Sequence, residues 1–188
     1  MKLISLLEKL EYTCLQGSTD QEVKNVIYDS RKVEEGSLFI CIRGAVVDGH
    51  KFVPDVVAKG AKVLIVEEAV EAPEDVTVIL VKDTRYAMAF ISAAYFGYHA
   101  EKLKTIGITG TKGKTTTTYM VKSILENAGY KVGLIGTIEA IIGDKVIPAK
   151  NTTPESYVIQ EYFHEMAEAG CDCVVMEVSS QGLMLQRT

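Results

Sequence analysis

The first hundred residues alternate between short apolar runs and segments whose apolar residues recur at helical spacing. A short apolar run bounded by turn residues is typical of a buried strand, whereas apolar residues every three or four positions predict one face of a helix. Strands are expected at 25–28, 37–42, 63–66 and 76–81. Helices are expected at 1–12, 52–59 and 84–98. Helices that connect successive strands form βαβ units, so this stretch predicts a small α/β domain.

A second alternation begins at Lys104, after a candidate linker at 97–102. Expected strands are at 105–109, 132–136 and 173–178, and a hairpin is expected to turn at Gly143-Asp144. Expected helices are at 115–128, before Gly129, and from Pro154 to about Ala169. The pattern predicts a second α/β domain.

The chain has 188 residues, 47% of them hydrophobic, and a formal net charge of −5. This composition favours one or two globular domains over a disordered chain. The acidic balance disfavours a general nucleic-acid binder, which needs a basic face. The longest apolar runs fall far short of the roughly 20 residues that cross a bilayer, so no membrane segment is expected. The cysteines lack the spacing of a disulfide framework or a zinc site, which favours a reducing, cytoplasmic location.

A glycine-rich segment, GITGTKGKTTTT from Gly107, lies between an expected strand and an expected helix. Glycines let backbone N–H groups turn toward phosphate oxygens, a lysine adds positive charge, and the next threonine hydroxyl can contact Mg²⁺. The match is to the short form GxxGK[ST], ending in Lys114-Thr115, because Ile108 replaces the first glycine of the longer form. The alternative is an ordinary turn with a solvated lysine, which the order of strand, loop and helix disfavours.

A phosphate-loop nucleotidase also needs an acidic residue at the end of a neighbouring buried strand. The run CVVMEV supplies Glu177 at such an end. Alone, this glutamate is more simply explained as a solvated edge residue, but the phosphate loop favours a metal-holding role. The expected fold class is α/β: a small N-terminal α/β domain at 1–99, followed at 100–188 by the start of a phosphate-loop, mostly parallel-sheet ATPase domain.

Three longer stretches, taken with the loop and Glu177, resemble the Mur ligase family, the ATP-dependent amide-forming enzymes of bacterial cell-wall precursor synthesis. They are DSRKVEEGSLFICIRGAVVDGHKF (29–52), NTTP (151–154) and MEVSSQGLMLQR (176–187). The first is similar to the N-terminal domain of the ligases that add the third residue and the final dipeptide. The other two are similar to the third-residue ligase. The resemblance spans nearly the whole chain.

The resemblance implies a role for each matching position. ATP would be held by Gly110, Thr111, Lys112, Gly113, Lys114, Thr115 and Thr116. Lys114 and Glu177 would be catalytic, and Thr115 and Glu177 would hold Mg²⁺. Tyr28 and Ser30 would contact the uridine diphosphate part of UDP-MurNAc-L-Ala-D-Glu. The muramoyl-dipeptide part would contact Asn151, Thr152, Thr153, Ser179 and Arg187.

The family reaction transfers the γ-phosphoryl group of ATP to a substrate carboxylate, and the amine of a diamino acid then attacks the acyl phosphate. The resemblance implies that the chain ends inside the ATPase domain and lacks the domain that binds the amino acid. We therefore expect no ligase activity from these residues alone, and lysine and meso-diaminopimelate both stay open, as does the oligomeric state. A sheet that ends at the strand 173–178 would also leave an edge uncovered, which predicts poor stability or association.

Two positions depart from the family pattern: Lys112 replaces a common Asn, and Gln181 replaces a common His. Several site candidates also have simpler explanations. Asp29-Ser30-Arg31 is a common polar turn, the segment 151–154 can merely start a helix, and an arginine such as Arg187 is usually solvated. The alternatives at the level of function are the dipeptide-adding ligase of the same family and a non-catalytic module that binds a nucleotide or a UDP-sugar.

Overall fold

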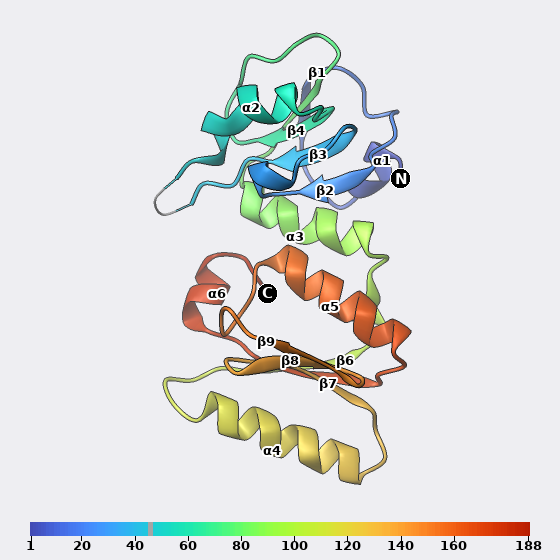
Figure 1. The fold of residues 1–188 in the computed structure, drawn as a ribbon, viewed down its shortest axis with the longest axis vertical. Helices are drawn as coiled ribbons and strands as arrows, with labels where there is room; N and C mark the ends of the chain where they lie inside the picture. Colours follow the sequence, from blue (N-terminus) through green and yellow to red (C-terminus); the bar gives the residue numbers. More distant parts are fainter. Residues whose placement is uncertain (45–46) are drawn as a thin grey trace. The chain divides into compact units, whose positions relative to one another are not determined.

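The computed structural model describes residues 1–44 and 47–188, which divide into two compact units, Met1–Tyr95 and Phe96–Thr188 (Figure 1). Ala45 and Val46, inside the stretch 29–52 that carries part of the family resemblance, lie outside the described residues. Each unit contains one five-stranded sheet with helices on its faces. The expected α/β fold class is confirmed.

The first unit is built on a sheet with the strand order β1-β5-β4-β3-β2. The strands β2 to β5 are parallel to their neighbours, and β1 is antiparallel to β5. The strands are β1 (Thr13–Gln16), β2 (Asn25–Ile27), β3 (Ser37–Ile40), β4 (Val63–Val66) and β5 (Thr77–Leu80). The helices are α1 (Leu3–Leu6), η1 (Ser30–Lys32), η2 (Gly49–Phe52), α2 (Val53–Ala58) and α3 (Thr84–Tyr95).

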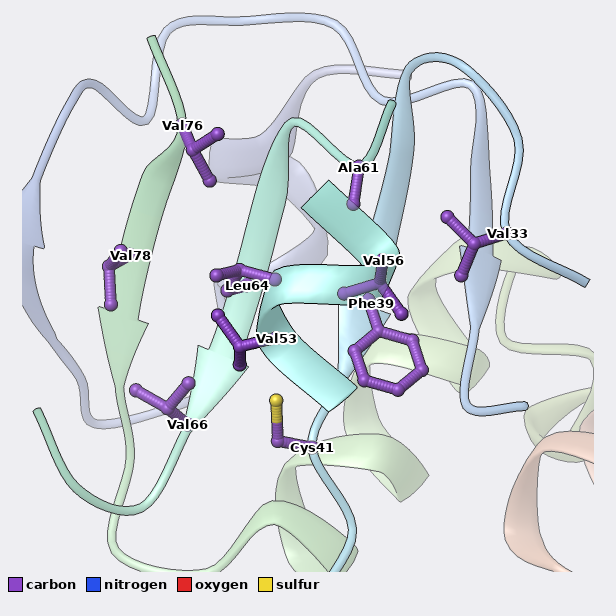
Figure 2. Packing of buried hydrophobic residues seen from close by; sticks show 10 residues of the cluster. All are labelled: Val33, Phe39, Cys41, Val53, Val56, Ala61, Leu64, Val66, Val76 and Val78. Carbon is purple, nitrogen blue, oxygen red and sulfur yellow. The ribbon is translucent and has the colours of Figure 1, made fainter. Parts of the chain in front are cut away.

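One face of this sheet packs against α2, and Figure 2 shows the resulting apolar cluster. Val53 and Val56 of α2 point toward Phe39 of β3 and Leu64 of β4, and all four side chains are buried. The helix α3 covers the opposite face (Figure 1). Strands buried on both faces have near-continuous apolar sequences, as the VLIV of β4 has.

The N-terminal segment differs from the expected helix at 1–12, because only Leu3–Leu6 are helical and β1 follows. The two buried leucines of α1 account for the apolar pattern. The strand β1 was not predicted because its residues are mostly exposed and show no alternation. It forms because it pairs along the edge of β5, with Thr13 opposite Leu80.

The second unit has the strand order β6-β10-β7-β8-β9. The strands β6, β10 and β7 are parallel, and β8 and β9 add an antiparallel hairpin. The strands are β6 (Lys104–Ile108), β7 (Val132–Ile135), β8 (Glu139–Ile142), β9 (Lys145–Pro148) and β10 (Cys173–Glu177). The helices are η3 (His99–Glu101), α4 (Lys114–Asn127), α5 (Ser156–Glu168) and α6 (Ser180–Met184).

The last strand in sequence, β10, is central in the second sheet. It lies between β6 and β7, so β10 itself is not the uncovered edge that was expected. The sheet instead ends at β6 and β9. The position of β10 matters because the carboxyl ends of three parallel strands then meet at one edge of the sheet.

The helices α4 and α5 lie on opposite faces of this sheet (Figure 1). Alternate residues of β10 point to the two faces: Val175 packs with residues of α4, and Val174 packs with Phe163 and Met166 of α5. This alternation buries both faces of the strand. The described helices include no segment long and apolar enough to cross a lipid bilayer.

Candidate functional site

The glycine-rich loop joins β6 to α4, as the sequence pattern predicts. Gly110 has φ 148° and Gly113 has φ 79°, a conformation that residues with a Cβ rarely adopt. Gly113 directly precedes α4, and among the described residues no side chain caps this helix. The backbone N–H groups of its first turn therefore have no partner within the helix and are available to an anion. The Lys114 ammonium donates a hydrogen bond to the Gly110 carbonyl at 2.7 Å, so the lysine lies folded over the loop.

The carboxylate of Glu177 lies at the end of β10, directly beside this loop. It is 1% exposed and accepts a hydrogen bond from the Thr115 hydroxyl at 3.0 Å. The residue after β7, Thr137, donates its backbone N–H to Glu177 Oε1 at 2.8 Å, and its hydroxyl lies 3.1 Å from Oε2. The structure thus brings together Thr115 and Glu177, which are 62 residues apart in sequence.

The chemistry of this group of side chains fits magnesium. Mg²⁺ is a hard cation that prefers oxygen ligands and is usually bound by one or two protein groups plus substrate phosphates. A carboxylate and a hydroxyl within 3.0 Å of each other, at the N-terminus of a helix that favours anions, are ligands of this kind. Thr115 and Glu177 are therefore the described residues suited to hold the ion.

Thr137 is a site residue that sequence analysis did not predict. Its hydroxyl contacts both the Glu177 carboxylate and the Thr152 hydroxyl, the latter at 3.0 Å. A signal was present, since Gly136-Thr137 directly follows the apolar strand β7 and polar residues at the carboxyl ends of parallel strands often form sites. Its significance depends on β10 pairing with β7, which the order of elements along the chain does not reveal.

A cavity of about 330 Å³ opens next to this network. It is lined by Thr137, Lys150, Asn151, Thr152, Thr153, Ser179, Gln181 and Arg187. Every residue expected to contact the muramoyl-dipeptide is in this lining, although the two segments are some thirty residues apart in sequence. Lys150 was not predicted.

Two of the cavity residues are held by contacts of their own. Thr153 is buried, and its hydroxyl donates to the Glu177 carbonyl and accepts from the Ser179 N–H, both at 3.0 Å. Arg187 donates to the Thr153 carbonyl at 2.9 Å and to the Glu155 carboxylate at 2.6 Å. The arginine is therefore not the solvated residue that the simpler explanation supposed, and its guanidinium already has one acidic partner.

In the first unit, the expected Tyr28 and Ser30 lie at the end of β2, where η1 begins. The carboxylate of Asp29 caps η1 and pairs with Arg31 at 2.7 Å. The hydrogen bond from this guanidinium lowers the pKa of Asp29 to about 2. The Ser30 carbonyl accepts a hydrogen bond from Lys59 at 2.8 Å. Tyr28 and Ser30 are half-buried, so this polar turn is ordered and still accessible.

Comparison with known families gives two successive matches. The profile of the "Mur ligase family, catalytic domain" matches residues 22–96, and that of the "Mur ligase middle domain" matches residues 108–188. The chain belongs to the Mur ligase family. The resemblance expected from the sequence motifs is thereby confirmed.

Several relatives carry the name UDP-N-acetylmuramoyl-L-alanyl-D-glutamate–2,6-diaminopimelate ligase. The protein from Clostridium perfringens is 52% identical over 187 residues, and that from Clostridioides difficile is 46% identical. The match covers all of this chain but 39% and 38% of those two proteins, so the chain spans well under half their length.

Solved structures agree with this fold. A structure of a UDP-N-acetylmuramoyl-L-alanyl-D-glutamate–2,6-diaminopimelate ligase superimposes with a TM-score of 0.81, covering all of this chain and 37% of that one at 23% identity. A MurF structure from Acinetobacter baumannii gives a TM-score of 0.66 at 27% identity, covering 95% of this chain and 36% of that one. At 23% identity, the likeness to the diaminopimelate ligase structure concerns the fold alone.

Proposed function

We propose that this chain is the substrate- and ATP-binding part of a ligase that joins 2,6-diaminopimelate to UDP-MurNAc-L-Ala-D-Glu at the expense of ATP. The observation that carries the proposal is the buried Glu177 carboxylate, held by Thr115 of the phosphate loop and lying next to the cavity lined by residues 150–153. The names of the relatives supply the chemistry, and they favour diaminopimelate over lysine.

In this proposal the loop binds the phosphates of ATP. The free N–H groups at the start of α4 donate hydrogen bonds to phosphate oxygens, and the Lys114 ammonium leaves the Gly110 carbonyl to contact the β and γ phosphates. Thr115 and Glu177 hold Mg²⁺, which when bound neutralises charge on the transferring phosphoryl group. Thr137 orients the Glu177 carboxylate through two contacts, so the carboxylate needs no rearrangement.

The cavity residues bind the muramoyl-dipeptide and direct its carboxylate toward the γ-phosphorus. Attack by this carboxylate forms an acyl phosphate and releases ADP, and attack by the amine of the amino acid then releases phosphate and a proton and leaves an amide. Phosphorylation is needed because a carboxylate is a poor electrophile. The residues of this chain contribute by positioning the substrates and by neutralising charge on the phosphoryl group. Tyr28 and Ser30 bind the uridine diphosphate end, and the protein acts in the cytoplasm, where UDP-linked precursors are made.

Two other functions compete with this one. The dipeptide-adding ligase shares the fold, but the sequence relatives from Clostridium perfringens and Clostridioides difficile, 52% and 46% identical to this chain, carry the name of the diaminopimelate ligase. A non-catalytic module would bind a UDP-sugar or ATP without turnover. Lys114, Thr115 and Glu177 are all present and in contact with their neighbours, which favours a working site over a decayed one.

Calorimetric titration of the 188-residue chain tests the two halves separately. We expect UDP-MurNAc-L-Ala-D-Glu to bind the wild type and to bind Ser30→Ala about tenfold or more weakly, the cost of about 1.4 kcal/mol for a lost polar contact. We expect Mg-ATP to bind Ser30→Ala normally and to bind Glu177→Gln weakly. If the folded chain binds UDP-glucose as tightly as it binds UDP-MurNAc-L-Ala-D-Glu, the substrate assignment is wrong. If the affinity of Glu177→Gln for Mg-ATP equals that of the wild type, the metal assignment is wrong.

A further inference from the structure

Two histidines of the second unit, His99 in η3 and His164 in α5, lie in contact. His99 Nε2 is 3.1 Å from His164 Nδ1, and the ring centroids are 4.8 Å apart. Glu168 lies one helical turn after His164, and the three side chains offer ligand atoms that are all within 4.8 Å of one another. Both imidazoles are half-buried and the carboxylate is exposed. His99 precedes β6 and Glu168 precedes β10, whereas the phosphate loop and Glu177 lie at the carboxyl ends of these two parallel strands, so the cluster is not part of the proposed active site.

The remaining histidine, His50, shows what a purely structural histidine looks like in this chain. Its Nδ1 lies 2.6 Å from the Asp48 carboxylate, and its Nε2 accepts the backbone N–H of Glu67 at 3.0 Å. Both ring nitrogens are therefore used. Arg43 also pairs with Asp48 and Glu68, so a cation already neutralises those carboxylates. The described contacts of His99 and His164 include no arginine like Arg43.

We propose that His99, His164 and Glu168 bind a divalent transition-metal ion of the Zn²⁺ class. Tetrahedral Zn²⁺ with bonds of about 2.0–2.1 Å to nitrogen places its ligand atoms about 3.3 Å apart, close to the 3.1 Å between the two ring nitrogens. His164 and Glu168 are four residues apart on α5, and residues at this spacing share a helix face. Two imidazoles and one carboxylate suit Zn²⁺, Co²⁺ or Ni²⁺ better than Mg²⁺ or Ca²⁺.

The protonation of His99 is compatible with this binding. Partial burial, the positive charge of Lys102 and the nearby His164 lower the pKa of His99, so the ring is neutral at pH 7. In the metal-free pair one N–H lies between the two rings. Metal binding needs a lone pair on each facing nitrogen. The proton between the rings therefore leaves, and the other nitrogen of the same ring takes up a proton. Lys102 opposes the cation, and its removal should strengthen binding.

Titration of the metal-stripped, tag-free chain with Co²⁺ alone tests the proposal, because tetrahedral Co²⁺ has a characteristic visible absorption. We expect one Co²⁺ per chain, displaced by Zn²⁺, with the absorption lost in His99→Gln and in His164→Gln. We expect Glu168→Gln to bind at least about tenfold more weakly, the loss typical even of outer-sphere changes, and Lys102→Gln to bind more tightly. The control is Glu126→Gln, which removes an exposed carboxylate from α4 on the other face of the sheet and should bind as the wild type.

Circular dichroism of each variant separates loss of binding from loss of folding, and Glu168→Gln, an exposed change, keeps the test valid if a histidine variant unfolds. The proposal is overturned if the folded wild type shows no tetrahedral Co²⁺ absorption at millimolar metal. It is equally overturned if His164→Gln or Glu168→Gln binds as tightly as Glu126→Gln, which would assign the metal to other groups. The proposal does not rest on the proposed ligase function, because its readout involves neither ATP nor a UDP-sugar.

Discussion

At the residue scale, single polar contacts determine how the candidate sites respond to their surroundings. The turn that holds Ser30 depends on the Asp29 carboxylate, which caps η1 and pairs with Arg31. Its pKa of about 2, below the ordinary 3.8, means that the folded state prefers the charged form. The stabilisation is therefore complete above pH 4 and is lost as the pH falls from about 4 to 2.

Asp29→Asn should remove this pH-dependent stabilisation while it retains the cap, because an asparagine oxygen also accepts the Arg31 N–H. Arg31 is largely exposed, so we expect a loss of about 1 kcal/mol or less at pH 6. Thermal unfolding of the wild type and the variant at pH 6, 4 and 2.5 measures the difference, which should shrink toward zero at the lowest pH. A difference that is constant across this range would contradict the assignment.

Cysteine reactivity gives a second test at this scale. Cys41 is buried in the apolar cluster of Figure 2, and burial together with the nearby Asp48 and Glu67 raises its pKa to about 12. The thiolate is the reactive form, so Cys41 should resist iodoacetamide at pH 8, whereas the exposed Cys14 should react. Peptide mass spectrometry checks this, with Cys14→Ser as the control. Labelling of Cys41 in the folded chain at the rate of Cys14 would contradict the burial.

At the element scale, the end of β7 determines where the Glu177 carboxylate lies. Gly136 follows this strand, and a Cβ at this position would lie 2.6 Å from Glu177 Oε1. Gly136→Ala should therefore displace the carboxylate and weaken Mg-ATP binding about tenfold or more, as changes around metal ligands typically do. A matched control is Gly107→Ala, whose Cβ would meet a methyl of Val178 at 3.2 Å. Equal affinities of the two variants for Mg-ATP would show that the carboxylate position is unimportant.

Most elements could be predicted from the sequence, because apolar periodicity and turn residues are local signals. Val63–Val66 and the hairpin turn at Gly143-Asp144 are where the pattern places them. Two features were missed for a physical reason. The strand β1 forms through pairing with β5 rather than through its own pattern, and the central position of β10 follows from long-range parallel pairing.

Part of the candidate site could also be predicted from the sequence. Lys114, Thr115 and Glu177 stand out because loop spacing and a strand-ending carboxylate are visible in sequence. Thr137 does not stand out, because its contact with Glu177 exists only once β10 lies beside β7. The partners of Arg187 were likewise invisible, since Thr153 and Glu155 lie more than thirty residues earlier.

At the scale of the whole molecule, the second unit exposes apolar surface on α4. Met120 and Ile124 are 61% and 67% exposed and lie four residues apart, and β6 is an edge strand of the same unit. Exposed apolar side chains and an open strand edge favour association. We expect the 188-residue chain to self-associate as its concentration rises.

Sedimentation velocity measures this association. Met120→Glu combined with Ile124→Lys should shift the chain toward monomer, and the charges should also pair along the helix. The control is Met184→Lys on α6, where the methionine is 72% exposed, and it should associate as the wild type does. A wild type that stays monomeric at every concentration would contradict the prediction, as would equal association of the α4 variant.

The central claim is that the loop before α4 binds the phosphates of ATP through Lys114. Lys145, an exposed lysine at the amino end of β9 and outside the loop, is a control for the loss of one positive charge. Calorimetric titration of the folded chain with Mg-ATP should give a loss of about tenfold to a hundredfold in Lys114→Ala, the range of a charge-assisted hydrogen bond of about 1.5–3 kcal/mol, and a small change in Lys145→Ala. Equal effects of the two substitutions, or no Mg-ATP binding by the folded wild type, would contradict the claim.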